Sequence, residues 1–471
     1  MKKFMTIFAV LAMVFFVSCS NSLENKETVD TGDTSADKTD TDTGDTDTDP
    51  ADTGDTNTAD PTNPTEPTDD PTEEVSWEAK YKKADGHAEN VSADVVKANN
   101  DLGMKIFSKL AAAEAGRNMM ISPLSISIAM AMSTNGASGE NIDEMKEVLG
   151  FGGMELPDVN EQFMHLIASL VAADKDLVLE IANSVWMRED FSLDVKAAFT
   201  DVLNEFYDAE IFTEGFNVEN INAWVSEKTN GKIDEIVKEI GEDVVMYLIN
   251  AIYFKAAWTT AFNEENTREG IFTLSDGTNT TADFMSFAEN EDAPTLLAYS
   301  SGWGDKDGFS MIRIPYGRDV FAFYGIVPSE DNESNIDDFI AKIAENGFDS
   351  YLSQLREEGD FPIKLPKFKF EYEKPLVEIF KELGMEKAFE EGGFHNIAEL
   401  PRDPFISNIL HKTFIEVNEA GTEAAAVTAV EYSDEAEPSH FYANRPFIFV
   451  IRDDRTGSIL FIGKVENPSA E

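Results

Sequence analysis

The chain has 471 residues, in which 90 acidic side chains outweigh 37 lysines and arginines to give a formal net charge of −53. A surface potential of this sign repels nucleic acids, heparin-like polyanions and anionic lipid surfaces, so we expect none of these as direct partners. We expect a monomer. The single cysteine excludes a disulfide framework, and the length suits one large domain or two ordinary ones that rely on a hydrophobic core.

The N-terminus has the pattern of an export signal. Lys2 and Lys3 precede the apolar stretch 4–17, which is too short to span a bilayer. Cys19 follows directly, and the segment FVSC at its end resembles a bacterial lipobox, in which cleavage leaves a lipidated cysteine. We therefore predict a lipoprotein signal peptide at 1–18 and lipid attachment at Cys19. An ordinary signal peptide is the alternative, but no A-x-A-like cleavage site follows.

Export and a lipid on Cys19 would place the protein at the cell envelope. Ser20, the next residue, is not the aspartate associated with inner-membrane retention. We therefore expect the outer membrane or the cell surface in a two-membrane organism. The lipid would be the only contact with the membrane.

Residues 19–76 consist largely of Asp, Thr, Gly and Pro, with 18 acidic residues and 2 lysines between Ser20 and Ser76. Such a segment cannot bury enough apolar surface to fold, so we predict a disordered acidic stalk. The alternating aspartates lack the glycine and terminal glutamate of an EF-hand loop, and we expect no metal site.

The remainder, 77–471, alternates helical and strand patterns after a short transition over 77–90. Ser92 is a suitable N-cap for a helix that Gly116 would end. Strand patterns cover 181–187, 244–254, 309–315, 320–327, 413–417, 446–451 and 459–465, and helical patterns cover 126–132, 142–149, 195–206, 221–229 and 375–383. This mixture predicts an α+β fold.

The most informative segment lies near the C-terminus. Residues 419–430 read EAGTEAAAVTAV, a run that suits a strand, yet they open a long connection between two strands. Connections longer than about 12 to 15 residues are usually functional or disordered, and this composition does not suit disorder. A segment that can be loop or strand indicates a conformational switch.

These residues match a known family. The segment NEAGTEAAAVTA at 418–429 resembles the hinge of inhibitory serpins, and 445–449 with 461–468 resembles the serpin C-terminal signature. Further matches in the family's order are NMMISPLSI at 118–126, NAIYFKAAW at 250–258, LPKF at 365–368 and HK at 411–412. The resemblance covers about 94–468. It implies a serpin domain with three β-sheets, eight or nine helices and an exposed reactive loop at 420–444.

The resemblance also implies a mechanism and a partner, a serine protease or a cysteine protease. The protease attacks the loop as a substrate and forms an acyl-enzyme. Before water releases the enzyme, the N-terminal half of the loop would insert into the main sheet, between the strands near 244–254 and 410–418. The expected hinge residues are Glu419, Gly421, Thr422, Ala424, Ala426 and Thr428. Gly421 supplies backbone freedom, and the last four are small side chains that would face the core at period two.

The family's spacing places the cleaved bond. It lies fourteen residues after Gly421 and eleven before Pro446, and both counts give Glu435, so the predicted bond is Glu435-Ala436. An acidic residue there indicates a glutamyl endopeptidase as the target. Cleavage after Tyr432 would instead suit a chymotrypsin-like enzyme, with an inserted arm three residues shorter.

Four further residues match the polar cluster beneath the opening sheet of serpins, namely Ser122, Ser125, Asn250 and His411. Trp258 matches the tryptophan near the point where the loop enters the sheet. A buried histidine is more often a satisfied core residue than a catalyst, and here the structural and functional readings agree.

Two alternatives stay open. A hydrolase would need converging catalytic groups, but the five histidines are scattered and the chain has no H-E-x-x-H, G-x-S-x-G or P-loop motif. We therefore expect no enzyme and no cofactor. A non-inhibitory serpin that binds or carries a ligand would show bulky, charged or proline residues on the inward face of the hinge, and the hinge shows none.

Overall fold

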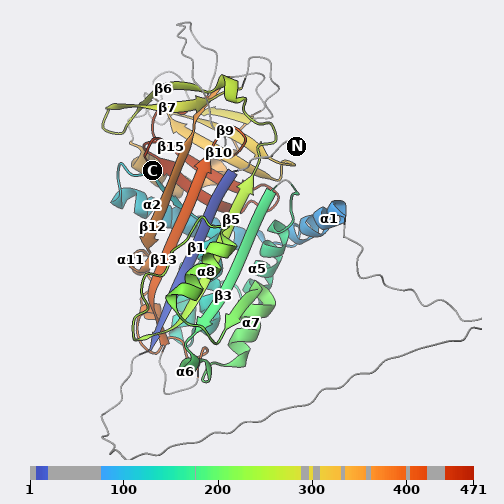
Figure 1. Cartoon of the computed structure of the whole chain (residues 1–471), viewed down its shortest axis with the longest axis vertical. Coiled ribbons are helices and arrows are strands. Elements are labelled where there is room, and N and C mark those ends of the chain that lie inside the picture. Colours follow the sequence, from blue (N-terminus) through green and yellow to red (C-terminus); the bar gives the residue numbers. More distant parts are fainter. Residues whose placement is uncertain are drawn as a thin grey trace, which may run out of the picture. The chain divides into compact units, whose positions relative to one another are not determined.

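The computed structural model describes residues 7–19, 76–175, 177–287, 296–300, 308–329, 335–356, 362–398, 404–421 and 441–470. These residues form three β-sheets, as expected, surrounded by helices (Figure 1). The α-helices of this part are α1 (Trp77–Ala88), α2 (Ala93–Ala113), α3 (Pro123–Gly136), α4 (Glu140–Val148), α5 (Leu156–Leu170), α6 (Glu189–Ser192), α7 (Ala197–Tyr207), α8 (Val218–Lys228), α9 (Ile336–Asn346), α10 (Phe348–Leu352) and α11 (Val377–Glu382).

Sheet A is the largest element of the fold and contains the strands on which the predicted function depends. Its order is β12 (Phe368–Pro375), β13 (Pro404–Val417), β1 (Ile7–Cys19), β5 (Val244–Ala256), β3 (Leu177–Met187) and β4 (Ala209–Phe212). The predicted strands at 181–187, 244–254 and 413–417 are confirmed. Both β13 and β5 are longer than predicted, because their ends carry polar or small residues that a strand pattern does not reveal.

Sheets B and C complete the β-structure. Sheet B has the order β2 (Met119–Ile121), β16 (Ile459–Val465), β15 (Phe447–Asp453), β10 (Phe321–Pro328), β9 (Phe309–Tyr316) and β8 (Leu296–Ser300). Sheet C has the order β14 (Phe441–Tyr442), β11 (Ile363–Pro366), β7 (Asn279–Met285) and β6 (Arg268–Thr273). Near the end of the predicted loop at 420–444, the strand β14 pairs with β11 in sheet C.

The core lies between sheets A and B. Phe254 of β5 contacts both Phe321 of β10 and Phe461 of β16, with ring centroids 6.0 Å apart in each pair. Helix α3 packs on β5 and on β16, and almost all of its residues are buried. A helix that is buried on nearly every side belongs in such a position, and Ser122 is the N-cap of α3.

The helix α2 shows how local sequence sets an element. Ser92 is its N-cap and accepts a hydrogen bond from the Asp94 N–H, as predicted. The buried face repeats at helical spacing. The chain leaves helical geometry after Ala113, and Gly116 adopts a positive φ of 74° in the turn that follows.

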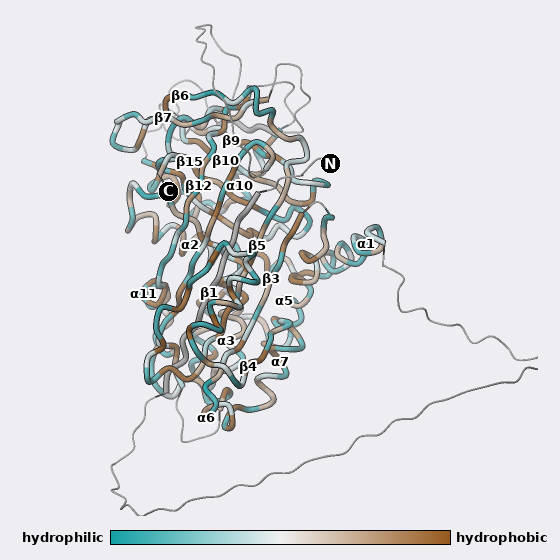
Figure 2. Tube along the Cα trace, viewed as in Figure 1, coloured by the Kyte–Doolittle hydropathy of each residue, from teal (hydrophilic) through white to brown (hydrophobic). Residues whose placement is uncertain are grey.

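The predicted transition over 77–90 is wrong, because most of it forms α1. This helix is largely hydrophilic (Figure 2), and its sequence alone does not predict burial. Asp85 accepts hydrogen bonds from Arg318 at 2.7 Å and from Arg455 at 3.0 Å. The Tyr81 hydroxyl accepts one from the Lys175 N–H at 3.0 Å. Contacts with residues far away in sequence therefore stabilise α1.

Several strands were not predicted either, and β1 is the one that matters most for the site. Residues 7–19, the apolar part of the predicted signal peptide, form β1, which lies between β13 and β5 in Figure 1. The prediction that 1–18 is a signal peptide concerns processing and stays a prediction. The predicted stalk at 19–76 lies outside the described residues, apart from Cys19 and Ser76.

Gly463 of β16 lies so close to the neighbouring strands β15 and β2 that it yields a prediction. A Cβ on Gly463 would lie 2.5 Å from the Met119 carbonyl oxygen and would also meet the Phe449 ring. Gly463→Ala should lower the free energy of unfolding by about 1–3 kcal/mol through overpacking. The matched control is Gly153→Ala, because no atom lies within 4 Å of that Cβ. Denaturant unfolding of both variants checks this, and equal stabilities would contradict the packing.

Candidate functional site

The strands β5 and β13 are one strand apart. Each pairs antiparallel with β1, which contacts β13 from Phe8 opposite Glu416 to Cys19 opposite Pro404. On its other side β1 contacts β5, from Ile7 opposite Ala256 to Ser18 opposite Val244. The sequence predicted insertion between these two strands, and the structure shows that sheet A holds a strand there. We call this position the slot.

Beneath the slot, the start of α3 carries two of the predicted serines. Ser122 caps the helix, and its hydroxyl accepts a hydrogen bond from the Ser125 N–H at 3.2 Å. The Ser125 hydroxyl donates to the Asn250 side-chain oxygen on β5. The structure therefore brings Ser122, Ser125 and Asn250 together, and all three are fully buried. Their hydrogen bonds tie α3 to sheet A.

His411 on β13 completes the predicted cluster. Its Nε2 accepts a hydrogen bond from the Ser122 N–H at 3.1 Å, which requires the neutral imidazole with its proton on Nδ1. Complete burial lowers the pKa of His411 from 6.5 to about 3. Since this histidine is neutral at pH 7 and its acceptor nitrogen is occupied, it holds β13 against α3 rather than transferring protons.

Two members of this cluster were not predicted from the sequence. Asn183 of β3 accepts a hydrogen bond from the Asn250 amide at 2.8 Å and donates to the Tyr207 carbonyl at 2.7 Å. Thr413 of β13 donates to the Met120 carbonyl of β2 at 2.9 Å. The period-two alternation of β13 was the available signal, since it places Thr413 on the same face as His411. No sequence signal connects Asn183 to the group.

At the end of β13, Trp258 is close to the predicted hinge. Its Nε1 donates to the Asn418 carbonyl at 2.9 Å, and its ring stacks on Tyr316 with centroids 4.6 Å apart. Asn418 and Gly421 exchange two backbone hydrogen bonds of 3.2 Å around the pair 419–420. Gly421 has a φ of +110°, a conformation that favours glycine, so its predicted backbone role is consistent with the structure.

Glu419 anchors this turn. Its side chain is only 2% exposed, accepts a 2.6 Å hydrogen bond from the Thr267 hydroxyl and forms an ion pair with Lys367 at 3.1 Å. The Phe262 N–H donates to its carbonyl at 2.8 Å. Sequence reasoning placed Glu419 in the hinge without a partner. The tertiary structure adds that the hinge begins at a buried, paired carboxylate.

The remaining predicted site residues lie outside the described residues. They are Thr422, Ala424, Ala426 and Thr428 of the hinge and the predicted bond Glu435-Ala436. The Cys19 backbone is described, as the last residue of β1.

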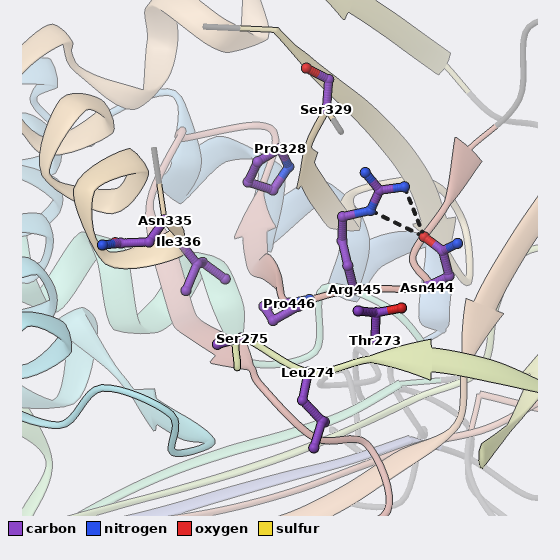
Figure 3. Close-up of a pocket in the computed structure, with 10 residues that line it drawn as sticks. All are labelled: Thr273, Leu274, Ser275, Pro328, Ser329, Asn335, Ile336, Asn444, Arg445 and Pro446. Carbon is purple, nitrogen blue, oxygen red and sulfur yellow. Dashed lines mark hydrogen bonds between the residues drawn. The ribbon is translucent and has the colours of Figure 1, made fainter. Parts of the chain in front are cut away.

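Where the chain leaves the predicted loop, an open cavity of about 390 Å³ lies beside the start of β15 (Figure 3). Arg445 there donates two hydrogen bonds to the Asn444 side-chain oxygen, at 3.2 and 3.1 Å. Pro328 and Ile336 form part of its apolar wall. Among the described residues, no group of three or more His, Cys, Asp or Glu side chains is arranged to hold a metal ion.

Comparisons with known proteins agree with this geometry. A family model described as Serpin (serine protease inhibitor) matches residues 97–468. An uncharacterized serpin-like protein of Thermococcus kodakarensis is 32% identical over 408 residues, which cover 82% of this chain and 88% of the relative. The native-state structure of tengpin, a thermophilic serpin, has a TM-score of 0.67 at 30% identity and covers 84% of this chain and 95% of its own.

A further solved structure, thyroxine-binding globulin in complex with thyroxine, has a TM-score of 0.68 at 24% identity. The match covers 80% of this chain and 99% of that protein. At this identity the likeness shows the shared fold alone.

The burial of His411 predicts how stability depends on pH. Its pKa is about 3 in the folded chain and 6.5 when unfolded. The stability that neutral His411 provides is therefore fully present above pH 6.5 and is lost as the pH falls toward 3. Between pH 6.5 and 5, protonation of the unfolded chain should cost about 2 kcal/mol of unfolding free energy. His411→Gln should flatten this part of the profile. Denaturant unfolding of both proteins at several pH values checks this, and parallel profiles would contradict it.

Proposed function

Because the chain belongs to the serpin family, whose described activity is serine protease inhibition, we propose that it is a suicide-substrate inhibitor of serine or cysteine proteases. A protease would cleave the loop after Glu435, and the freed N-terminal arm would enter the slot while the acyl-enzyme persists. The observation that carries the proposal is the turn closed by the antiparallel bridge between Asn418 and Gly421, since a ladder continued from this bridge would return along β13.

The register of that turn supports the predicted bond. Asn418 lies opposite Gly421, and in an antiparallel ladder each step forward on one strand is a step back on the other. If this ladder continued without interruption, Thr422 would lie opposite Val417, and Glu435 would lie opposite Pro404, the first residue of β13. An arm cut after Glu435 would thus span β13 to its beginning. An arm ending at Tyr432 would stop at Ser407, which makes cleavage there the less favourable alternative.

The same register supports the prediction that four small side chains of the hinge would face the core. The β13 residues opposite Thr422, Ala424, Ala426 and Thr428 would be Val417, Ile415, Thr413 and His411, and each of these is at most 1% exposed. Directly opposed residues share one face of a sheet. The four small side chains would therefore enter the core side of the slot, above the polar cluster, where bulky or charged residues would clash.

Insertion provides a physical driving force. An arm of about 14 residues at roughly 3.3 Å each would carry the attached protease roughly 50 Å along the sheet. Its backbone would gain hydrogen bonds with β5 and β13, each contributing about 0.5–1.5 kcal/mol net, which sums to on the order of 10 kcal/mol. A free energy of this size can distort the active site of the acyl-enzyme and prevent its hydrolysis.

The residues around the bond favour a protease with a basic specificity pocket. Glu435 would occupy that pocket in the manner of a glutamyl endopeptidase substrate. Glu431, Asp434 and Glu437 flank the bond and would steer such an enzyme electrostatically. A chymotrypsin-like enzyme cutting after Tyr432 is the second target class.

We place the inhibitor at the cell envelope, with a lipid on Cys19 and residues 19–76 as the spacer. Among the described residues, no helix is sufficiently long and apolar to cross a membrane. In this proposal the lipid provides the membrane attachment.

The proposal is tested by incubating the chain from Ser20 onward with a glutamyl endopeptidase, chymotrypsin, trypsin and papain. Denaturing electrophoresis then detects covalent complexes, and mass spectrometry identifies the released peptide. A denaturant-resistant complex together with a peptide that begins at Ala436 would support the mechanism and the bond. Cleavage of the loop by all four enzymes without any complex would overturn the proposal in favour of a non-inhibitory serpin.

The direction of the hinge side chains gives a sharper prediction. Thr422→Arg would bring an unpaired charge opposite buried Val417, at a cost of several kcal/mol, and should slow insertion. The protein should then behave as a substrate, with cleaved chain replacing most of the covalent complex. Electrophoresis of the products measures this partition.

Glu423→Arg is the matched control. Position 423 would lie opposite Glu416, which already forms an ion pair with Lys369 at 3.5 Å near the sheet surface. An arginine there meets an opposite charge rather than the core, so the yield of complex should stay close to that of the parent. Equal losses in the two variants would contradict the assigned faces.

A further inference from the structure

The slot is already occupied by a strand of the chain itself. We propose that the leader, residues 7–19, acts as an intramolecular plug, so that the uncleaved precursor cannot trap a protease and removal of the leader activates the inhibitor. This inference rests on the proposed function. It assigns to the signal segment a second role, the temporary blocking of the slot.

The pairing of β1 is extensive on both sides. Twelve consecutive residues, Phe8 to Cys19, have partners on β13, and another twelve, Ile7 to Ser18, have partners on β5. Each ladder has one register shift, at Phe16/Val17 and at Val17/Ser18. The leader therefore pairs with the facing edges of both strands over nearly their full length. Without a strand in this place, the backbone N–H and C=O groups of these edges would lack partners.

The leader and the loop arm would compete for one position. Phe8 lies opposite Glu416, the place that the hairpin register assigns to Glu423. Cys19 lies opposite Pro404, the residue that the hairpin register assigns to Glu435. The ladder between β1 and β13 contains one register shift, so the leader and the arm would match residue for residue except for this shift. The leader runs antiparallel to β13, and the inserted arm would do the same. Since only one strand separates β5 from β13, the two occupants exclude each other.

The composition of the leader suits a central strand. Its thirteen residues, IFAVLAMVFFVSC, contain no charge, glycine or proline and are rich in β-branched and aromatic side chains. A strand buried in the middle of a sheet typically has such a continuous apolar sequence. The arm is richer in alanine, a weaker strand former, so the leader does not need cleavage of the loop to compete with it.

The predicted processing site links the plug to export. Cys19 is the last residue of β1, so cleavage before it would separate the rest of the strand from the chain. The slot would then become available only in the processed protein, at the envelope where the proposed inhibitor acts. Precursor that stays inside the cell would leave proteases there untouched.

The test compares the full chain with the chain from Ser20 onward, both made by cell-free synthesis in the same mild detergent. Complex formation is measured with whichever protease reacts in the panel described above. We expect the full chain to react about tenfold or more slowly, because reactivity falls with the fraction of molecules whose slot is open. Hydrogen exchange is the second readout, and β5 and β13 should be better protected in the full chain.

Two substitutions in the full chain test whether the leader acts by pairing within sheet A or only by being attached to the chain. Ala12 lies opposite Ala251 and Lys412, and Ala12→Pro places a residue without an N–H in the middle of β1, which removes a hydrogen bond from the one ladder that this N–H serves. This variant should regain fast complex formation and lose the added protection. Thr6→Pro, one residue before β1 begins, is the matched control and should behave as the full chain does.

The outcomes distinguish the two hypotheses. Equal reaction rates and equal exchange for the full and leaderless chains would overturn the plug and leave the proposed function in place. A leaderless chain that forms no complex with any protease, while the full chain still protects β5 and β13, would overturn the proposed function alone and support the plug as a structural element.

Discussion

The structure depends on one constraint: in the middle of sheet A, β5 and β13 are separated by the width of one strand. Both strands present backbone N–H and C=O groups to this slot, and buried groups of this kind need partners. A third strand therefore has to fill the slot, or the sheet has to close. The described part of the chain supplies β1 as that strand, and the proposed inserted arm would need the same place.

The polar groups around the slot set how readily it can change occupant. Beneath it, Ser122, Asn250 and His411 connect α3 to both flanking strands through buried hydrogen bonds. At its upper end, the carboxylate of Glu419 is buried and paired with Lys367. Satisfied polar groups of this kind rigidify a core, whereas an unpaired one is costly. Strand exchange has to preserve these bonds or break them together.

Much of the fold and of the site was accessible from the sequence because local patterns carried it. The strand β16 was predicted at its observed bounds, and Ser92 caps α2 as predicted. The cluster of Ser122, Ser125, Asn250 and His411 came from a family resemblance, and the structure brings all four residues together. Helix α1 was missed, because Asp85 meets Arg318 and Arg455 only after the chain has folded. Asn183 was missed for the same reason.

The sequence by itself determined several of the strands and the small-residue, strand-like composition of the hinge. Only the tertiary structure decided that 7–19 forms a strand between β5 and β13, because register and strand order arise from pairing between residues hundreds of positions apart. It also decided that Glu419 is buried and that His411 is neutral. Burial and hydrogen-bond partners depend on the folded surroundings, which composition and spacing do not contain.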